Sequence, residues 1–161
     1  MKFKKLILIL SLFSISCGNI GAGSLGAWKI KVFPVSNKQL ALSINSIYKE
    51  YPKYKVPEKW KYESEYWIRD GFEVSKIMFF YFDSNPEEMY FVSFLEPGLV
   101  KNPEYARLAI RSIFTEKTGW KEIKKYSDSE KLRIEGRFEQ EIIPKLERLT
   151  GTKSYFEKTY P

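Results

Sequence analysis

The chain has 161 residues, the length of one domain, and its content of 43% hydrophobic and 17% aromatic residues suits a packed core and argues against global disorder. It contains no histidine and one cysteine, which excludes Ser-His-Asp and Cys-His catalysis, an intrachain disulfide and a zinc site built from several thiolates. The net charge is +7, or +4 without residues 1–16, and the charges are mixed along the chain rather than gathered in the basic stripe of a nucleic-acid-binding protein.

The N-terminus has the three parts of a secretory signal. Three lysines fall within residues 1–5, residues 6–13 are apolar apart from one serine, and the small residues Ser14 and Ser16 precede Cys17. The apolar stretch is about ten residues long, which makes about 15 Å of helix, half of the bilayer core. We therefore expect residues 1–16 to be a signal peptide, rather than a permanent membrane span or the first helix of the domain.

The boundary motif Ser14-Ile15-Ser16-Cys17 resembles the lipobox of bacterial lipoprotein precursors, whose cysteine is diacylated and becomes the mature N-terminus. It departs from that pattern at Ser14, where the motif prefers leucine, and Ser-x-Ser also suits an ordinary signal peptidase. The lone cysteine stands where lipidation requires one, which favours a lipoprotein over plain secretion. The resemblance implies export, a fatty-acyl (palmitate) anchor on Cys17 and attachment to a membrane of the cell envelope, where several acyl chains give stable binding.

Residues 17–26 begin with the cysteine, and the nine residues after it contain four glycines. They lack the preceding strand and the Lys-Ser end of a phosphate-binding loop, so we interpret them as a flexible tether. The tether leads to one globular domain of residues 27–161.

The first half of this domain begins with a loosely alternating stretch, residues 28–35, which predicts a strand that Pro34 ends or confines to a sheet edge. Ser36 or Asn37 can cap a helix that reaches Tyr51, with one apolar stripe at spacings of three and four. We expect residues 52–71 to form a long aromatic loop that has room for one short element.

The strongest strand signal covers residues 74–82 and 89–95, which are rich in aromatic and β-branched residues on both alternating faces. The turn-forming residues 83–88 between them predict a hairpin. Because both faces are apolar, we expect these to be central strands.

Two helices are predicted after the hairpin. The first covers residues 102–119, with Asn102 as its cap and Gly119 as its stop, and its buried stripe is Tyr105, Leu108, Ala109, Ile113 and Phe114. The second covers residues 127–149, with a capping box of Ser127 and Glu130 and a kink at Pro144. The whole order predicts an α+β domain, a small antiparallel sheet with about three helices packed against it.

Catalysis without histidine would depend on carboxylates, lysine, serine or tyrosine. Asp83, Glu87 and Glu88 lie together in the hairpin loop, and a pair of carboxylates can cleave a glycosidic bond when one of them is held protonated. We interpret the group as a solvated turn, because water screens an exposed loop and opposes such a pKa shift. The alternating charges of residues 131–141 indicate a solvent-facing helix surface, and no metal site or cofactor is indicated.

The aromatic cluster Trp60, Tyr62, Tyr66 and Trp67 is the best candidate for a binding surface, since exposed aromatic side chains stack on sugar rings or anchor protein partners. The alternative, which we favour, is that they cover an open end of the core. Tyr51 and Tyr54, with Lys53 and Lys55, could equally face anionic lipid.

Three functions follow as hypotheses. The first is a non-enzymatic envelope lipoprotein that binds another envelope component, either protein or glycan. The second is a carboxylate-based cell-wall hydrolase. The third is an immunity or inhibitor protein that shields the envelope from a toxin or lysozyme.

Overall fold

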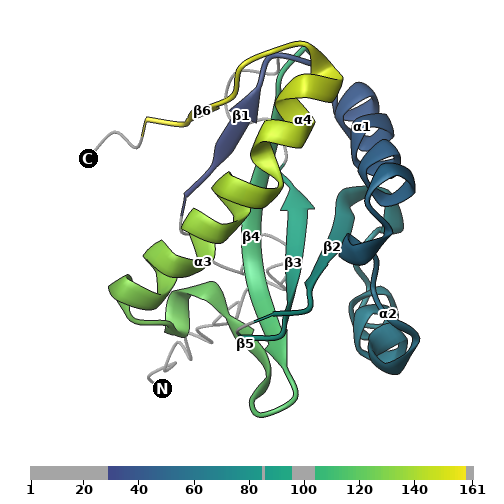
Figure 1. Ribbon diagram of the computed structural model, residues 1–161, viewed down its shortest axis with the longest axis vertical. Coiled ribbons are helices and arrows are strands. Elements are labelled where there is room, and N and C mark those ends of the chain that lie inside the picture. The colour runs from purple at the N-terminus through teal and green to yellow at the C-terminus, as the bar shows by residue number, and fades with distance from the viewer. Residues whose placement is uncertain (1–28, 85, 96–103, 159–161) are drawn as a thin grey trace, which may run out of the picture.

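Antiparallel strands form the centre of the fold in the computed structural model, which describes residues 29–84, 86–95 and 104–158. The strand order is β2-β3-β4-β1-β6, with β5 paired to β4, and helices cover the sheet (Figure 1). The predicted α+β class is therefore confirmed. The predicted signal peptide of residues 1–16, Cys17, the predicted tether of residues 17–26 and the predicted cap Asn102 lie outside the described residues.

The N-terminal part follows the sequence pattern closely. Strand β1 (Lys31–Phe33) leads to helix α1 (Asn37–Glu50), and the Ser36 side chain caps the helix by accepting a hydrogen bond from the Gln39 N–H at 3.2 Å. The predicted apolar stripe is the buried face of α1: Leu40, Ile44 and Ile47 are at most 3% exposed.

Residues 52–71, predicted as a loop, instead form two single-turn 3-10 helices (Pro52–Tyr54 and Glu58–Trp60) and helix α2 (Lys61–Arg69). The helix was missed because no side chain caps its first turn and because its aromatic residues favour strands. Trp60 and Trp67 are seven residues apart, so they lie on one side of this segment and both are buried.

The hairpin is present as predicted. Strand β2 (Ile77–Phe82) pairs with β3 (Glu88–Phe94), and a further 3-10 turn at Val74–Lys76 precedes β2. Strand β3 is central and buried on both faces, as expected, whereas β2 lies at the edge of the sheet and pairs with β3 alone among the described residues.

The prediction of a helix over residues 102–119 is wrong, because strands β4 (Ala106–Thr115) and β5 (Gly119–Glu122) occupy this region. Strand β4 is buried on both faces, so its apolar residues do not alternate. A bulge adds to this: Phe91 pairs with Ser112 and Val92 with Ile110, which leaves Arg111 as an extra residue. The period of two is therefore interrupted, and the remaining apolar spacing resembles that of a helix. Gly119 adopts a positive φ of 63° in the β4–β5 turn and does not end a helix.

The last helical region is divided at the predicted position. Helix α3 (Asp128–Glu141) begins with the capping box of Ser127 and Glu130, and α4 (Ile143–Thr150) follows after a break at Ile142. Pro144 explains the break, because it has no N–H to donate to the preceding turn. After Gly151, strand β6 (Tyr155–Phe156) returns to pair with β1.

The sheet has apolar contacts on both faces. Helices α1, α3 and α4 pack on one face and enclose the larger core, in which Phe33, Phe80 and Tyr90 are fully buried (Figure 1). Trp60 and α2 cover part of the opposite face, where Met89 and Phe114 form a smaller cluster. No helix in the described ranges is long and apolar enough to cross a bilayer.

Candidate functional site

The predicted aromatic surface is divided by the fold. Trp60 and Trp67 are only 3% and 6% exposed, and the Trp67 ring stacks on Phe91 of β3 with a centroid distance of 4.4 Å. Trp60 contacts Phe114 edge-on at 5.0 Å. Trp60 therefore belongs to the smaller apolar cluster, called the second apolar cluster below, and Trp67 packs beside it on Phe91 and Trp120. Both tryptophans cover apolar surface of the sheet, as the favoured core interpretation expects.

The two tyrosines of the same cluster remain accessible. Tyr62 is 70% exposed and Tyr66 is 45% exposed on the outer side of α2. The Arg69 guanidinium lies 4.2 Å from the centre of the Tyr62 ring, a cation-π contact that holds this ring at the surface. Half of the predicted binding surface is thus available to a partner.

A groove of about 490 Å³ lies between α1, α2 and the edge strand β2. Its lining is mostly apolar and comes from three regions. Helix α1 contributes Ala41, Ile44 and Tyr48, residues 52–71 contribute Val56 and Ile68, and the hairpin region contributes Val74, Ile77, Met78, Phe79 and Phe94. Ile77, Met78 and Phe79 are consecutive, and consecutive residues of a strand point to opposite faces. The groove therefore runs along the exposed edge of β2, between the layers.

A second hollow of about 460 Å³ adjoins this groove. The two share Asn45, Tyr48 and Lys55, and the second is lined also by Leu42, Ser46 and Lys49 of α1. The combined groove is apolar along β2 and polar at the end of α1.

Tyr48 stands where the two hollows meet. Its hydroxyl donates a hydrogen bond to the Phe79 carbonyl on β2 at 2.8 Å, and its ring packs on Phe80 with a centroid distance of 5.6 Å. Burial raises the pKa of the Tyr48 hydroxyl well above its ordinary value, so the group stays a neutral donor. One backbone carbonyl of the edge strand is thus already satisfied from within the protein.

Two lysines at the polar end have no ion-pair partner among the described residues. Lys49 lies in the last turn of α1, and Lys55 directly follows the first 3-10 turn. Neighbouring Lys53 differs, because its ammonium lies 4.0 Å from a Glu141 carboxylate oxygen and 4.8 Å from the centre of the Tyr54 ring. The prediction that Tyr51, Tyr54, Lys53 and Lys55 together face lipid is therefore corrected. Tyr54 is buried in the core at 2% exposure, and Lys55 faces the groove.

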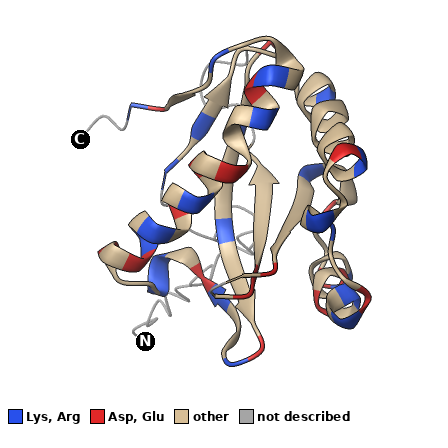
Figure 2. Ribbon diagram, in the orientation of Figure 1, with Lys and Arg blue, Asp and Glu red and all other residues tan. Residues whose placement is uncertain are grey.

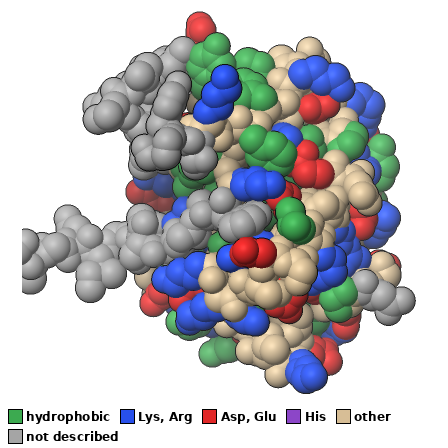
Figure 3. Space-filling model, turned by 90° about the vertical axis from the view of Figure 1, so that its left-hand side faces the viewer, with side chains coloured by type: hydrophobic (Ala, Val, Ile, Leu, Met, Phe, Trp, Pro, Cys, Tyr) green, Lys and Arg blue, Asp and Glu red, His purple; other side chains and the backbone are tan. Residues whose placement is uncertain are grey.

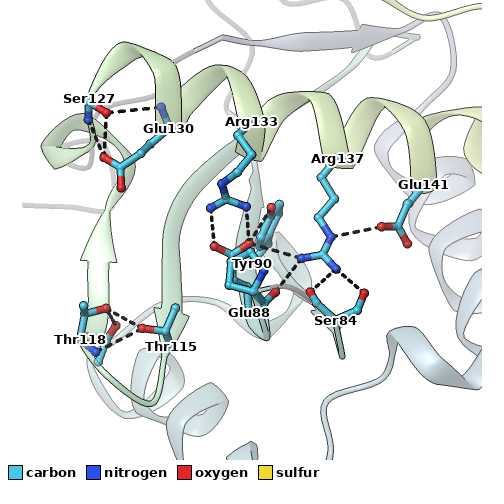
Figure 4. A network of polar contacts seen from close by, with 12 residues as sticks. Ser84, Glu88, Tyr90, Thr115, Thr118, Ser127, Glu130, Arg133, Arg137 and Glu141 are labelled. Atoms are coloured by element: carbon cyan, nitrogen blue, oxygen red, sulfur yellow. Dashed lines mark hydrogen bonds and ion pairs between the residues drawn. The ribbon is translucent and has the colours of Figure 1, made fainter.

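Among the hairpin carboxylates, Glu88 departs from the solvated turn that was predicted, whereas Asp83 is exposed. Glu88 is 2% exposed and accepts hydrogen bonds from both terminal nitrogens of Arg133, at 3.0 and 2.5 Å (Figure 4). Arg137 lies 3.5 Å from the same carboxylate, and the Tyr90 hydroxyl donates to it at 3.1 Å. Burial is tolerated because every side of the charge is paired.

Arg137 also holds the hairpin loop. It donates to the Ser84 carbonyl at 2.8 Å and to Glu141 at 3.1 Å (Figure 4). It also donates to the Pro86 carbonyl at 2.8 Å. Its guanidinium lies over the Phe82 ring at 4.5 Å. This cluster connects α3 to the start of β3, and its contacts are those of a structural element.

Glu87 is separated from Glu88 by the sheet itself. It pairs with Lys59 at 2.6 Å and accepts a hydrogen bond from Tyr81, which belongs to the second apolar cluster. The Lys59 contact lowers the pKa of Glu87 below its ordinary value. The pair thus offers no shared site with one protonated acid, and Asp83 is exposed beside it.

The charged surface of α3 is only partly the solvent-facing helix that was predicted. Acidic and basic residues alternate along it (Figure 2), but Arg133 and Arg137 reach the sheet. Glu135 and Glu139 pair with Lys29 and with Lys31 of β1, both at 2.7 Å. On the face that Figure 3 displays, basic and acidic side chains are interspersed.

No group of histidine, cysteine or acidic side chains that could hold a metal ion occurs in the described part of the chain. Comparison with known proteins gives no match to a family model, to a curated protein or to a solved structure. The candidate site is therefore the combined groove, which the sequence did not reveal because it is built from three separate segments.

Proposed function

We propose that the protein is a non-enzymatic lipoprotein of the bacterial cell envelope, exported by residues 1–16, held on a membrane by lipid on Cys17, and able to bind another envelope component in the groove between α1, α2 and β2. The lipobox-like motif supports the anchoring half. The groove supports the binding half.

The observation that carries the binding half is the concentration of exposed apolar side chains around this groove. Leu42, Ile68 and Val74 line the combined groove and are 60%, 41% and 65% exposed. Exposed apolar side chains that gather around one groove, rather than being scattered singly, favour an interaction site. A volume of about 490 Å³ is also within the usual range for ligand pockets, about 300 to 1,000 Å³.

The nearby tyrosines extend this surface along α2. Tyr62 and Tyr66 are exposed on the same helix as Ile68, and such rings suit either a glycan or a protein partner. An immunity or inhibitor role is a special case of protein binding and would use the same surface. The hydrolase hypothesis has less support, because Glu87 and Glu88 contact opposite faces of the sheet and Glu88 is held by two arginines.

The anchoring half is tested by growing cells with a clickable fatty acid and recovering the protein. We expect label on the wild type and none on Cys17→Ala, with an intact mass that begins at residue 17 and carries acyl groups. Equal labelling of the two proteins, or a soluble species that still begins at Met1, would overturn it.

The binding half is tested by recovery of partners from envelope extracts with variants that fill the groove. Ala41→Trp places an indole in the groove wall, while Leu132→Trp adds the same ring at an exposed position of α3 away from it. We expect the first variant to lose the partners that wild type recovers and the second to keep them. Identical recovery by all three proteins would reject the groove as the binding site.

A further inference from the structure

We infer that the combined groove binds a fatty acid, with its acyl chain along β2 and its carboxylate between Lys49 and Lys55. This inference rests on the proposed function, because it names the ligand class of the same groove. Three features of the groove carry it: the lining, the unpaired charges and the state of the strand edge.

The lining suits an unbranched hydrocarbon chain. The part along β2 is bordered by Ile44, Val56, Ile68, Ile77 and Phe79. Its volume is about 490 Å³, whereas one water molecule occupies about 30 Å³ in the liquid, so the groove has room for a larger ligand. Apolar surface of this kind gains free energy when a hydrocarbon chain displaces water from it. Only a small number of polar side chains, among them Ser64 and Ser75, interrupt this part of the lining.

The charge of the ligand follows from the other end of the groove. Lys49 and Lys55 line the second hollow, no carboxylate pairs with either among the described residues, and Asn45 and Ser46 add hydrogen-bonding groups beside them. An anionic head would neutralise this end while its chain filled the apolar part.

A carboxylate suits this end better than a phosphate does. Phosphate sites commonly combine lysines with arginine forks, backbone N–H groups or a helix N-terminus. Here the cations are lysines, and Lys49 lies at the C-terminal end of α1, whose carbonyls carry a partial negative charge. A dianion would be repelled more strongly than a monoanion at this position.

The edge of β2 argues against an extended peptide as the ligand. A peptide that adds a strand to a sheet gains its affinity from main-chain hydrogen bonds along that edge. The Phe79 carbonyl already accepts a hydrogen bond from Tyr48, whose ring stands between the two hollows. An acyl chain needs no such hydrogen bond and can pass beside the ring.

The test is calorimetric titration of the purified full chain carrying Cys17→Ala, so that no covalent lipid competes, with decanoate, dodecanoate and tetradecanoate below the concentrations at which they form micelles. We expect one site per chain and a Kd that falls about threefold to fourfold for each added methylene group. Dodecanol and dodecyl phosphate serve as neutral and dianionic comparisons, and both should bind more weakly than dodecanoate.

Variants separate the two ends of the site. Lys49→Gln with Lys55→Gln should weaken dodecanoate about fivefold to thirtyfold and leave dodecanol unchanged. Lys38→Gln with Lys117→Gln removes the same charge from exposed lysines outside the groove and should change the Kd less than twofold. Ala41→Trp should weaken all chains.

Equal Kd values for dodecanoate and dodecanol, tighter binding of dodecyl phosphate, or no binding would each overturn the inference. Protection of the β2 amides from hydrogen exchange by a recovered envelope peptide, without fatty-acid binding, would also overturn it while leaving the proposed function intact. If neither wild type nor the variants recover any partner from envelope extracts, the binding half of the proposed function is rejected, whatever the titrations show.

Discussion

The carboxylate of Glu88, at the start of β3, accepts hydrogen bonds from both terminal nitrogens of Arg133 on α3, 45 positions further along the chain. The pair connects the sheet to the helix that covers it, and Arg137 lies close to the same carboxylate (Figure 4). Glu88 therefore acts as an attachment point between the two layers of the domain.

Replacing this carboxylate tests that role. Glu88→Gln leaves two arginines beside a neutral amide in a buried position, and removal of one partner from a buried ion pair is strongly destabilising. Because Arg133 is itself partly exposed, we expect the free energy of unfolding to fall by about 2–3 kcal/mol in urea titrations. Glu65→Gln, which removes the exposed partner of Arg69, should change it by less than about 0.5 kcal/mol. Similar effects of the two substitutions would contradict the assigned role.

Local signals allowed much of the fold to be predicted. Ser127 and Glu130 form their capping box within four residues, and Pro144 breaks the helix by an effect on its own preceding turn. The hairpin was predictable for the same reason, because its two strands are adjacent in sequence.

Strand β4 could not be predicted in this way. Its conformation depends on pairing with β1 and β3, and the extra residue at Arg111 conceals its period. The buried state of Glu88 likewise depends on Arg133, a residue that no local pattern connects to it. The groove could not be predicted from any local pattern either, since it exists only where α1, α2 and β2 meet.

The C-terminal tail should make stability depend on pH. Although burial raises the pKa of Glu147, hydrogen bonds from Lys153 and from the Ser154 N–H and hydroxyl lower it to about 2. A pKa lower in the folded than in the unfolded state contributes stability above about pH 4.5, and this is lost as the pH falls toward 2. We expect urea titrations at pH 6 and pH 2.5 to show about 1–2 kcal/mol more loss for wild type than for Glu147→Gln. Equal losses for both proteins would show that Glu147 is not responsible.

Tyr48 should stabilise the edge strand through its hydroxyl. Tyr48→Phe keeps the ring and removes the donor to the Phe79 carbonyl, so we expect a loss of about 1–2 kcal/mol in the free energy of unfolding. Tyr66→Phe, which removes a hydroxyl from an exposed side chain, is the matched control and should have little effect. If the carbonyl is freed, hydrogen exchange near β2 should also become faster in Tyr48→Phe alone, and unchanged exchange would contradict the role of this hydrogen bond.

Trp67 and Tyr62 both lie on α2, but one is buried and the other exposed, so replacing them should change the free energy of unfolding by very different amounts. Trp67 packs on Phe91 at 4.4 Å and Trp120 at 5.4 Å, so Trp67→Ala should leave a cavity and lower the free energy of unfolding by about 3–5 kcal/mol. Tyr62→Ala removes a ring that is 70% exposed and should cost less than about 1 kcal/mol, the value of its contact with Arg69. Thermal and urea unfolding of the two variants, read alongside recovery of partners from envelope extracts, separates the structural half of the cluster from the accessible half. A stable Trp67→Ala protein would mean that α2 does not depend on this residue for its attachment to the sheet.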